Sequence, residues 1–197
     1  HKHQTTRESQ KNANKAATNG IFLAFSSCLV FMAFGFLGVR PYFSTQTNVA
    51  EIIEYGCDYL FICSVFSFAV FGQITFERLL QSTGKTFYTM ITQATGAIVN
   101  IILDPILIFG YFGLPRMEMT GAAVATVIGQ TIAMLLAIYF NITKNREIEV
   151  ISKGFRPERE VIKRIYAVGI PTIFMISIGS LMTFGMNKIL LSFTSTA

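Results

Sequence analysis

The sequence predicts an all-helical membrane protein, a polytopic bundle with five transmembrane helices. Hydrophobic residues make up 52% of the 197 residues and charged residues only 14%, whereas soluble domains carry about 25% charged residues. Of the 16 basic and 11 acidic residues, only Asp104 and Lys188 lie inside the apolar stretches. This segregation excludes a soluble fold, a disordered chain and a disulfide-stapled secreted domain. The five stretches are residues 20–39, 59–76, 86–114, 120–143 and 166–193.

The length of each stretch supports a membrane crossing, because a helix needs about 17–25 residues to span about 30 Å of hydrocarbon. Residues 1–19 are polar and are expected to extend or cap the first span. Residues 40–58 begin with Arg40 and Pro41 and contain three acidic residues, which predicts a loop followed by an amphipathic lead-in to the second span.

The later connections are shorter, except for one. Residues 77–85 predict a tight turn at Gly84, and residues 113–119 predict another between the third and fourth spans. Residues 144–165 are the longest charged stretch. From Pro157 onward they are interpreted either as a short helix lying in the membrane interface or as a solvated linker.

The basic residues alternate between the two sides of the predicted membrane. Thirteen lie before the first span, in 77–85 and in 144–165, whereas only Arg40 and Arg116 lie in the loops on the other side. Cytoplasmic loops carry the excess of Lys and Arg, so the first residues are expected to be cytoplasmic in a multi-pass protein of the cell's inner membrane. The competing interpretation, a nucleic-acid surface, is set aside because the basic runs do not form one face.

Asp104 is the leading candidate for a functional residue. An ionisable group within a membrane span is costly and usually marks an ion or substrate pathway. Gln93, Gly96, Asn100 and Asp104 follow helical spacing and predict one polar face. Pro105 cannot donate a hydrogen bond to the carbonyl of residue 101 and predicts a helix kink there. The alternative is that Asp104 lies near the end of its span and is simply hydrated.

The fourth and fifth spans supply the remaining candidates. Thr126 and Gln130 lie four residues apart and are expected to face Asn100 and Asp104, unless Thr126 only bonds within its own helix. Pro171 predicts a second kink. Small residues at four-residue steps in the fourth span predict close helix contact: Gly121, Ala125 and Gly129.

Several motifs together resemble the multidrug and toxic compound extrusion (MATE) transporters. They are QKNANKAATNG at 10–20, ERLLQSTGKTFYTM at 77–90, NIILDPILIFG at 100–110, GAAVATVIGQ at 121–130 and VGIPT at 168–172. The LDP form of the third motif is most similar to the prokaryotic, DinF-like branch. The resemblance implies a fold of twelve helices in two lobes, of which the chain would be a fragment holding the third to seventh helices.

On this resemblance, residues 1–143 are the remainder of the N-terminal lobe with four transmembrane helices. Residues 144–165 are the basic cytoplasmic loop between the lobes, and residues 166–197 hold the first helix of the C-terminal lobe. The expected partners are the lipid bilayer, small hydrophobic or cationic substrates and the missing helices of the full-length protein, with no nucleic acid.

The implied function is a proton- or sodium-coupled antiporter that exports hydrophobic or cationic compounds. The coupling and substrate-cavity residues would be Asp104, Asn100, Thr126, Gln93 and Gln130. No cofactor is expected, and no metal other than sodium bound at Asp104 and Asn100. The alternatives are a lipid-linked saccharide flippase of the same wider superfamily and a scaffold subunit that transports nothing. Because no activated catalytic group is apparent beside Asp104, we do not expect an enzyme.

Overall fold

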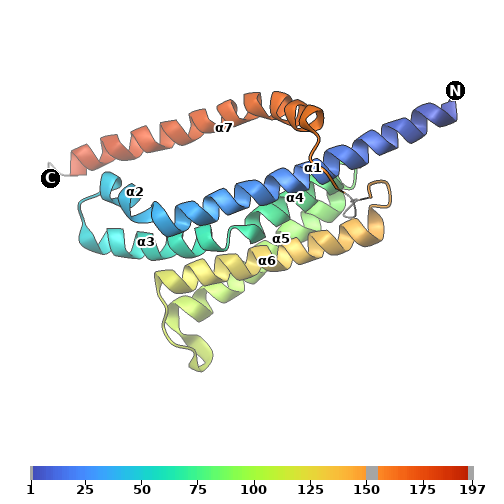
Figure 1. Ribbon diagram of the computed structural model, residues 1–197. Coiled ribbons are helices and arrows are strands. Elements are labelled where there is room, and N and C mark those ends of the chain that lie inside the picture. Colours follow the sequence, from blue (N-terminus) through green and yellow to red (C-terminus); the bar gives the residue numbers. More distant parts are fainter. Residues whose placement is uncertain (1, 150–154, 195–197) are drawn as a thin grey trace. The chain divides into compact units, whose positions relative to one another are not determined.

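The computed structural model describes residues 2–149 and 155–194, and the regular structure in these two ranges is entirely helical. The chain divides into two compact units, His1–Phe155 and Arg156–Ala197. Figure 1 shows the helices of the first unit running side by side along their lengths. The predicted all-helical class is confirmed, and each unit is described below by itself.

The first helix is longer than its apolar stretch. Helix α1 covers Lys2–Leu37, so the polar residues before position 20 continue the helix of the first predicted span. Buried Asn14, Thr18 and Asn19 lie in this polar part, which shows that it packs against the rest of the unit. Asn14 Oδ1 accepts a hydrogen bond from the backbone N–H of Glu149 at 3.0 Å.

The predicted loop at 40–58 is largely helical instead. Helix α2 covers Val39–Gln46, and helix α3 begins at Ala50 and ends at Val65. A three-residue connection separates them, so the predicted loop is shorter than expected, and the predicted lead-in to the second span lies on α3. The acidic residues assigned to an amphipathic lead-in lie on α3, where Glu51, Glu54 and Asp58 are exposed.

The second predicted span is broken. Helix α3 ends at Val65, helix α4 covers Phe68–Ser82, and the two axes differ by 51°. Short-range backbone bonds cross the break, from Ser67 N to Ser64 O and from Ala69 N to Phe66 O, both at 3.2 Å. These bonds satisfy backbone groups that a continuous helix would have paired.

The third and fourth spans form a helical hairpin. Helix α5 covers Thr86–Phe109, the 3₁₀ turn η1 covers Tyr111–Gly113, and helix α6 covers Met119–Lys144. Gly110 ends α5 with a φ of 73°, a left-handed conformation that glycine adopts without a steric penalty. The helix continues through Pro105, so this proline does not end it.

Small residues allow α5 and α6 to approach closely, as predicted. Gly121, Ala125 and Gly129 are all buried. A Cβ atom added to Gly121 would lie 2.7 Å from the carbonyl carbon and oxygen of Leu107, and one added to Gly129 would lie 2.9 Å from the carbonyl oxygen of Gly96. Each glycine therefore faces the backbone of the other helix, where no side chain fits.

Polar side chains attach the end of α6 to α4. Asn141 Nδ2 donates to the carbonyl oxygen of Phe76 at 2.9 Å, and Asn145 Nδ2 donates to that of Leu79 at 3.3 Å. Lys85 Nζ forms an ion pair with Glu147 Oε1 at 3.1 Å nearby. These contacts fix the end of α4 that carries Glu77.

The second unit contains helix α7, Arg159–Thr194, which continues through Pro171. None of its described residues is buried. The helix predicted to begin near Pro157 is present, but it is continuous with the fifth span rather than a separate surface element. Part of the predicted 144–165 loop, residues 150–154, lies outside the described residues.

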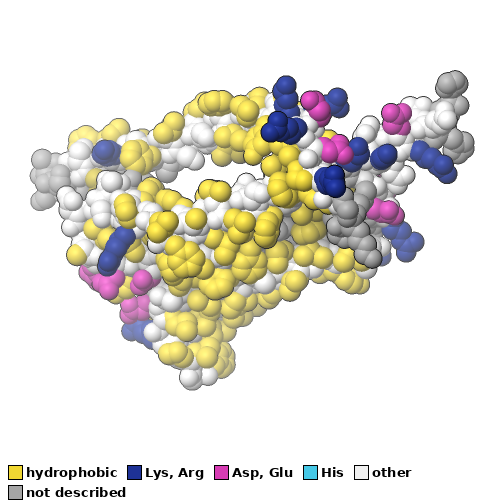
Figure 2. Space-filling model, in the orientation of Figure 1, with side chains coloured by type: hydrophobic (Ala, Val, Ile, Leu, Met, Phe, Trp, Pro, Cys, Tyr) yellow, Lys and Arg dark blue, Asp and Glu magenta, His cyan; other side chains and the backbone are white. Residues whose placement is uncertain are grey.

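The helices are suited to a membrane. Four are long and apolar enough to cross it, or five if the bent pair α3–α4 counts as one span. Figure 2 shows hydrophobic side chains over the middle of the first unit, with Lys, Arg, Asp and Glu gathered toward its ends. Many of its large apolar side chains are exposed, such as Val30, Phe36 and Ile101, as is typical of helices that lie in a bilayer.

Candidate functional site

A polar pocket lies between α4, α5 and α6 in the first unit. Its volume is about 380 Å³. It includes four residues expected from the sequence, which are Gln93 and Asn100 on α5 and Thr126 and Gln130 on α6. Its full lining is Gln73, Gln93, Gly96, Ala97, Asn100, Ile101, Thr126, Gly129 and Gln130.

The glycines of the helical hairpin shape this pocket. Gly96 and Gly129 lie opposite each other, and the Cβ of Asn100 lies 3.5 Å from the position that a Cβ on Gly129 would take. Because neither glycine has a side chain, the helices meet at this level and amides fill the adjacent positions. The small-residue pattern therefore contributes to the pocket as well as to helix packing.

Asn100 and Thr126 join the two helices through a hydrogen bond. Asn100 Nδ2 donates to Thr126 Oγ1 at 3.3 Å, and Thr126 Oγ1 donates to the carbonyl oxygen of Ala122 at 2.9 Å. Thr126 therefore contacts Asn100 as predicted and also bonds within its own helix. No donor among the described residues bonds to the carbonyl oxygen of the Asn100 amide, so this oxygen is available to accept a hydrogen bond or to bind a cation.

Asp104 does not line this pocket. It lies one helical turn beyond Asn100 and is half-buried, and it forms no hydrogen bond or ion pair with any residue that the structure describes. No bond joins it to Thr126 or Gln130 in these ranges. The predicted polar face thus divides: Gln93, Gly96 and Asn100 line the pocket, whereas Asp104 lies closer to the end of α5.

A second carboxylate is buried on α4, beside the half of α5 that lies away from Asp104. The sequence did not identify it as a site residue. Glu77 on α4 is 5% exposed. Gln73 Nε2 and Thr92 Oγ1 donate to its Oε1 atom at 3.1 and 2.8 Å, and Gln93 Nε2 donates to its Oε2 atom at 3.1 Å. The neighbouring Arg78 Nη1 donates to Gln81 Oε1 at 2.7 Å.

The sequence does contain a signal for this cluster. Glu77 lies seven residues before Gly84, and Thr92 lies eight residues after it. In two antiparallel helices joined by a tight turn, residues equally far from the turn face each other. Polar residues at matched distances on both sides of 82–85 therefore predict a polar contact between α4 and α5.

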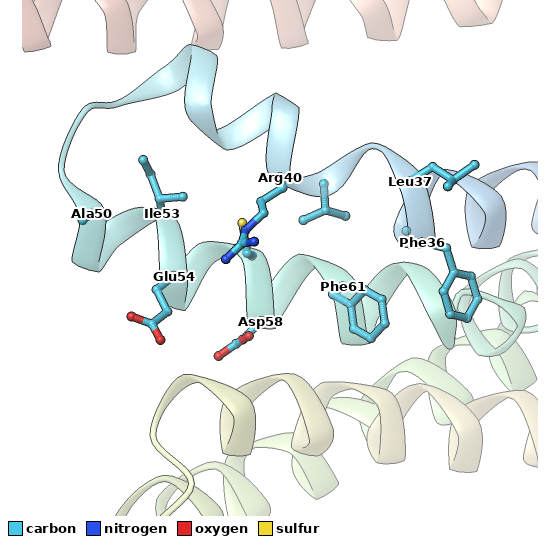
Figure 3. Close-up of a pocket in the computed structure, with 11 residues that line it drawn as sticks. Phe36, Leu37, Arg40, Ala50, Ile53, Glu54, Asp58 and Phe61 are labelled. Carbon is cyan, nitrogen blue, oxygen red and sulfur yellow. The ribbon is translucent and has the colours of Figure 1, made fainter.

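A larger pocket of about 650 Å³ lies between the end of α1, α2 and α3. Figure 3 shows the Arg40 side chain reaching toward α3, which carries Glu54 and Asp58. Within the described ranges no ion pair of 4 Å or less joins Arg40 to either carboxylate. The sequence did not predict this pocket.

Comparison with known proteins identifies relatives of the chain. The MatE family model matches residues 7–106. Multidrug export protein MepA of Staphylococcus haemolyticus (strain JCSC1435) is 32% identical over 126 residues, which is 64% of this chain and 27% of MepA. Probable multidrug resistance protein NorM of Bacillus cereus (strain ATCC 10987 / NRS 248) is 24% identical over 85% of this chain and 37% of NorM.

The fold is also that of a solved transporter. A structure of the MATE multidrug transporter DinF-BH superposes with a TM-score of 0.80 at 23% identity, covering 96% of this chain and 46% of that one. This chain therefore spans between about a fifth and just under half of the length of the relatives it matches. With half of its residues matched by the family model, this multi-pass membrane chain belongs to the MatE family.

Proposed function

We propose that the chain is part of a cation-coupled antiporter that exports hydrophobic or cationic compounds across the cytoplasmic membrane. The observation that carries the proposal is the polar pocket between α4, α5 and α6. In a segment whose outer surface is suited to lipid, polar side chains are stable where they face protein or a water-filled cavity. Relatives described as multidrug export and multidrug resistance proteins support export as the activity.

The coupling ion, a proton or sodium, is proposed to act at the Asn100 and Asp104 face of α5. Sodium prefers oxygen ligands, which the Asn100 carbonyl and the Asp104 carboxylate supply, whereas a proton needs only the carboxylate. Binding at one turn of α5 would favour a different arrangement of α5 against α6 and change the shape of the pocket. This is one step of alternating access, in which an ion shifts a population between two states.

The proposal also includes the orientation of the chain in the membrane and the division of its residues between two lobes. The N-terminal end of the chain is placed in the cytoplasm, and residues 144–165 are placed in a cytoplasmic loop that joins two lobes. Residues 1–143 would then be part of the first lobe, and residues 166–197 part of the second. The activity is transport rather than catalysis, with further helices of the transporter and lipid as its partners.

The proposal is tested by efflux of ethidium, a fluorescent cation, from cells that express the full open reading frame carrying this chain. Imposed proton and sodium gradients are applied separately. Asn100→Ala and Asp104→Asn are expected to lower gradient-driven efflux at least tenfold. Glu8→Gln is the matched control, because Glu8 is an exposed acidic residue on α1 away from the pocket.

The outcomes separate the alternatives. Unchanged efflux in Asp104→Asn would remove that residue from coupling, and unchanged efflux in Asn100→Ala would remove the pocket from the pathway. Labelling of Asn100→Cys by a water-soluble maleimide tests whether the cavity is accessible to water. An absence of labelling would contradict an accessible cavity and favour a scaffold subunit. Transfer of a lipid-linked saccharide without ethidium efflux would favour a flippase.

A further inference from the structure

We propose that Glu77 is a proton-binding site that controls the orientation of Gln73 in the polar pocket. This inference rests on the proposed function only in treating the pocket as functional. It is carried by two features of the cluster. Glu77 is buried with donors on both carboxylate oxygens, and two of those donors are pocket-lining glutamines.

The ionised form of Glu77 is well accommodated. It accepts hydrogen bonds from Gln73, Thr92 and Gln93 at 2.8–3.1 Å. A carboxylate can only accept hydrogen bonds, so both amides must present their NH₂ groups to it. Their carbonyl oxygens are then left for the pocket, which makes the pocket rich in acceptors while Glu77 is ionised.

A proton on Glu77 finds a hydrogen-bond acceptor only if it is bound to Oε1. Thr92 Oγ1 lies 2.8 Å from Glu77 Oε1 and 2.7 Å from the carbonyl oxygen of Thr89. The hydroxyl has one hydrogen and two lone pairs, so it can serve one of these acceptors at a time. A proton on Oε1 resolves this: Glu77 then donates to Thr92, and Thr92 donates to Thr89. A proton on Oε2 would instead face the NH₂ group of Gln93, which is itself a donor.

The charged groups around Glu77 leave its charge without a cationic partner in the described part of the chain. On α4, Arg78 is engaged with Gln81. At the start of α5, Lys85 is paired with Glu147. The remaining charges on the packed helices lie toward their ends, at Asp104 on α5, Lys144 on α6, and Arg7, Glu8, Lys11 and Lys15 on α1. A buried carboxylate without a cation is stabilised by its hydrogen bonds alone.

The two glutamines respond differently to that proton. Gln73 and Thr92 both donate to Oε1. A proton on Oε1 leaves the NH₂ group of Gln73 only a hydroxyl oxygen, which is a much weaker acceptor than a carboxylate oxygen. Gln93 bonds to Oε2, which remains an acceptor in both states. Protonation therefore releases Gln73 to turn its amide toward the pocket and leaves Gln93 in place. The pocket gains a hydrogen-bond donor when Glu77 binds a proton.

The first test is infrared spectroscopy of the purified chain in detergent micelles over a range of pH. Wild type is expected to show a pH-dependent carbonyl band of a protonated carboxylic acid that is lost in Glu77→Gln and kept in Glu8→Gln. Glu77→Asp, which retains a carboxyl group, is expected to keep a band at a shifted frequency and covers the case in which Glu77→Gln does not fold. An unchanged band in both Glu77 variants would overturn the proposal.

The second test follows the side-chain amides by NMR with ¹⁵N-glutamine. The Gln73 resonances are expected to move with pH, those of Gln93 to move less, and both movements to be lost in Glu77→Gln. Gln73→Leu should remove the moving resonance and keep the infrared band. Amides that stay fixed while Glu77 takes up a proton would overturn the link to the pocket.

Neither measurement depends on transport, so the two proposals fail separately. If ethidium efflux is unaffected by Asn100→Ala but the Glu77 infrared band and the Gln73 amide resonances change together with pH, the proposed function fails and the proton site stands. If efflux requires Asn100 while Glu77 shows no protonation, the proposed function stands and the proton site is overturned.

Discussion

The two halves of α5 each lie beside a carboxylate, and the two carboxylates have opposite surroundings. Glu77 faces the first half of α5, is 5% exposed and accepts three hydrogen bonds from side chains. Asp104 lies near the other end, is half-buried and has no bonded partner among the residues described. Asp104 interrupts an apolar stretch and is conspicuous in the sequence, whereas Glu77 lies in a polar turn motif and is not.

The comparison shows that the position of a charge within an apolar stretch does not determine its burial. Burial depends on whether neighbouring helices supply donors at the right level, because an unsatisfied buried polar group costs more free energy than one hydrogen bond returns. The turn at 82–85 aligns polar residues of α4 and α5 around Glu77. No comparable set of donors surrounds Asp104 in the described ranges.

The largest expected effect separates the two carboxylates directly. Glu77→Ala removes the acceptor of Gln73 and Gln93 and leaves a cavity at a buried position, although Thr92 can still donate to Thr89. Large-to-small changes at buried positions cost about 2–5 kcal/mol, so the free energy of unfolding should fall by several kcal/mol. Asp104→Ala should change it by less than about 0.5 kcal/mol, as for other substitutions away from packed features. Unfolding in mixed detergent micelles, followed by circular dichroism, measures both. Equal losses would show that the two carboxylates contribute alike to stability.

The next effect tests whether the Asp104 half of α5 is held by packing instead of by hydrogen bonds. Gly121→Ala places a methyl group 2.7 Å from the carbonyl group of Leu107, and overpacking of this kind costs about 1–3 kcal/mol. Gly20→Ala is the control, since nothing lies within 4 Å of its added Cβ. In the same assay the control should be neutral or slightly stabilising. A neutral Gly121→Ala would show that the helices can separate there without cost.

A smaller effect concerns the level between the two carboxylates. The coupling energy between Asn100→Ala and Thr126→Ala in a double-mutant cycle should be about 0.6 kcal/mol, the average for hydrogen bonds between membrane helices. Because Thr126 keeps its own bond to Ala122, the Asn100 substitution alone should account for most of the loss. Zero coupling would mean that the 3.3 Å contact adds nothing to helix association.

The smallest effect lies beyond the Glu77 cluster, at the turn. Lys85→Met breaks an ion pair with an exposed glutamate at 3.1 Å, which is worth about 0.2–1 kcal/mol and declines as salt is added. Lys144→Met is the control, because Lys144 has no ion pair within the described ranges. A loss as large as that of Glu77→Ala would show that the turn, rather than the buried cluster, sets the stability of this end.

The sequence predicts α5, α6 and α7 well, because long apolar stretches with glycine or charge at their ends have clear boundaries. It does not predict the break near Phe66 and Ser67, where neither proline nor glycine is present and both halves are apolar. The break instead reflects tertiary contacts: Ser64 lies against Gly35 of α1, and Ser67 Oγ lies 3.8 Å from Cys28 Sγ.

The candidate site is predictable to a similar extent. Helical spacing places Gln93 and Asn100 on one face and directs Thr126 toward Asn100, because periodicity along one helix is local information. Glu77 requires the pairing of two helices across a turn. A pattern that stays within a single span does not contain this pairing, and the polar turn around Glu77 suggests an interface rather than a buried group.

The 51° break between α3 and α4 has a mechanical consequence. Rotation about a few backbone torsions at one point can swing a short rigid segment, whereas an unbroken helix must bend along its whole length. Helix α4 is such a segment of 15 residues, and it carries both Gln73 and Glu77. Because the end of α4 that carries Glu77 is bonded to α6, a change of charge at Glu77 would turn α4 about this break together with the contact to α6, while α3 stays packed against α1.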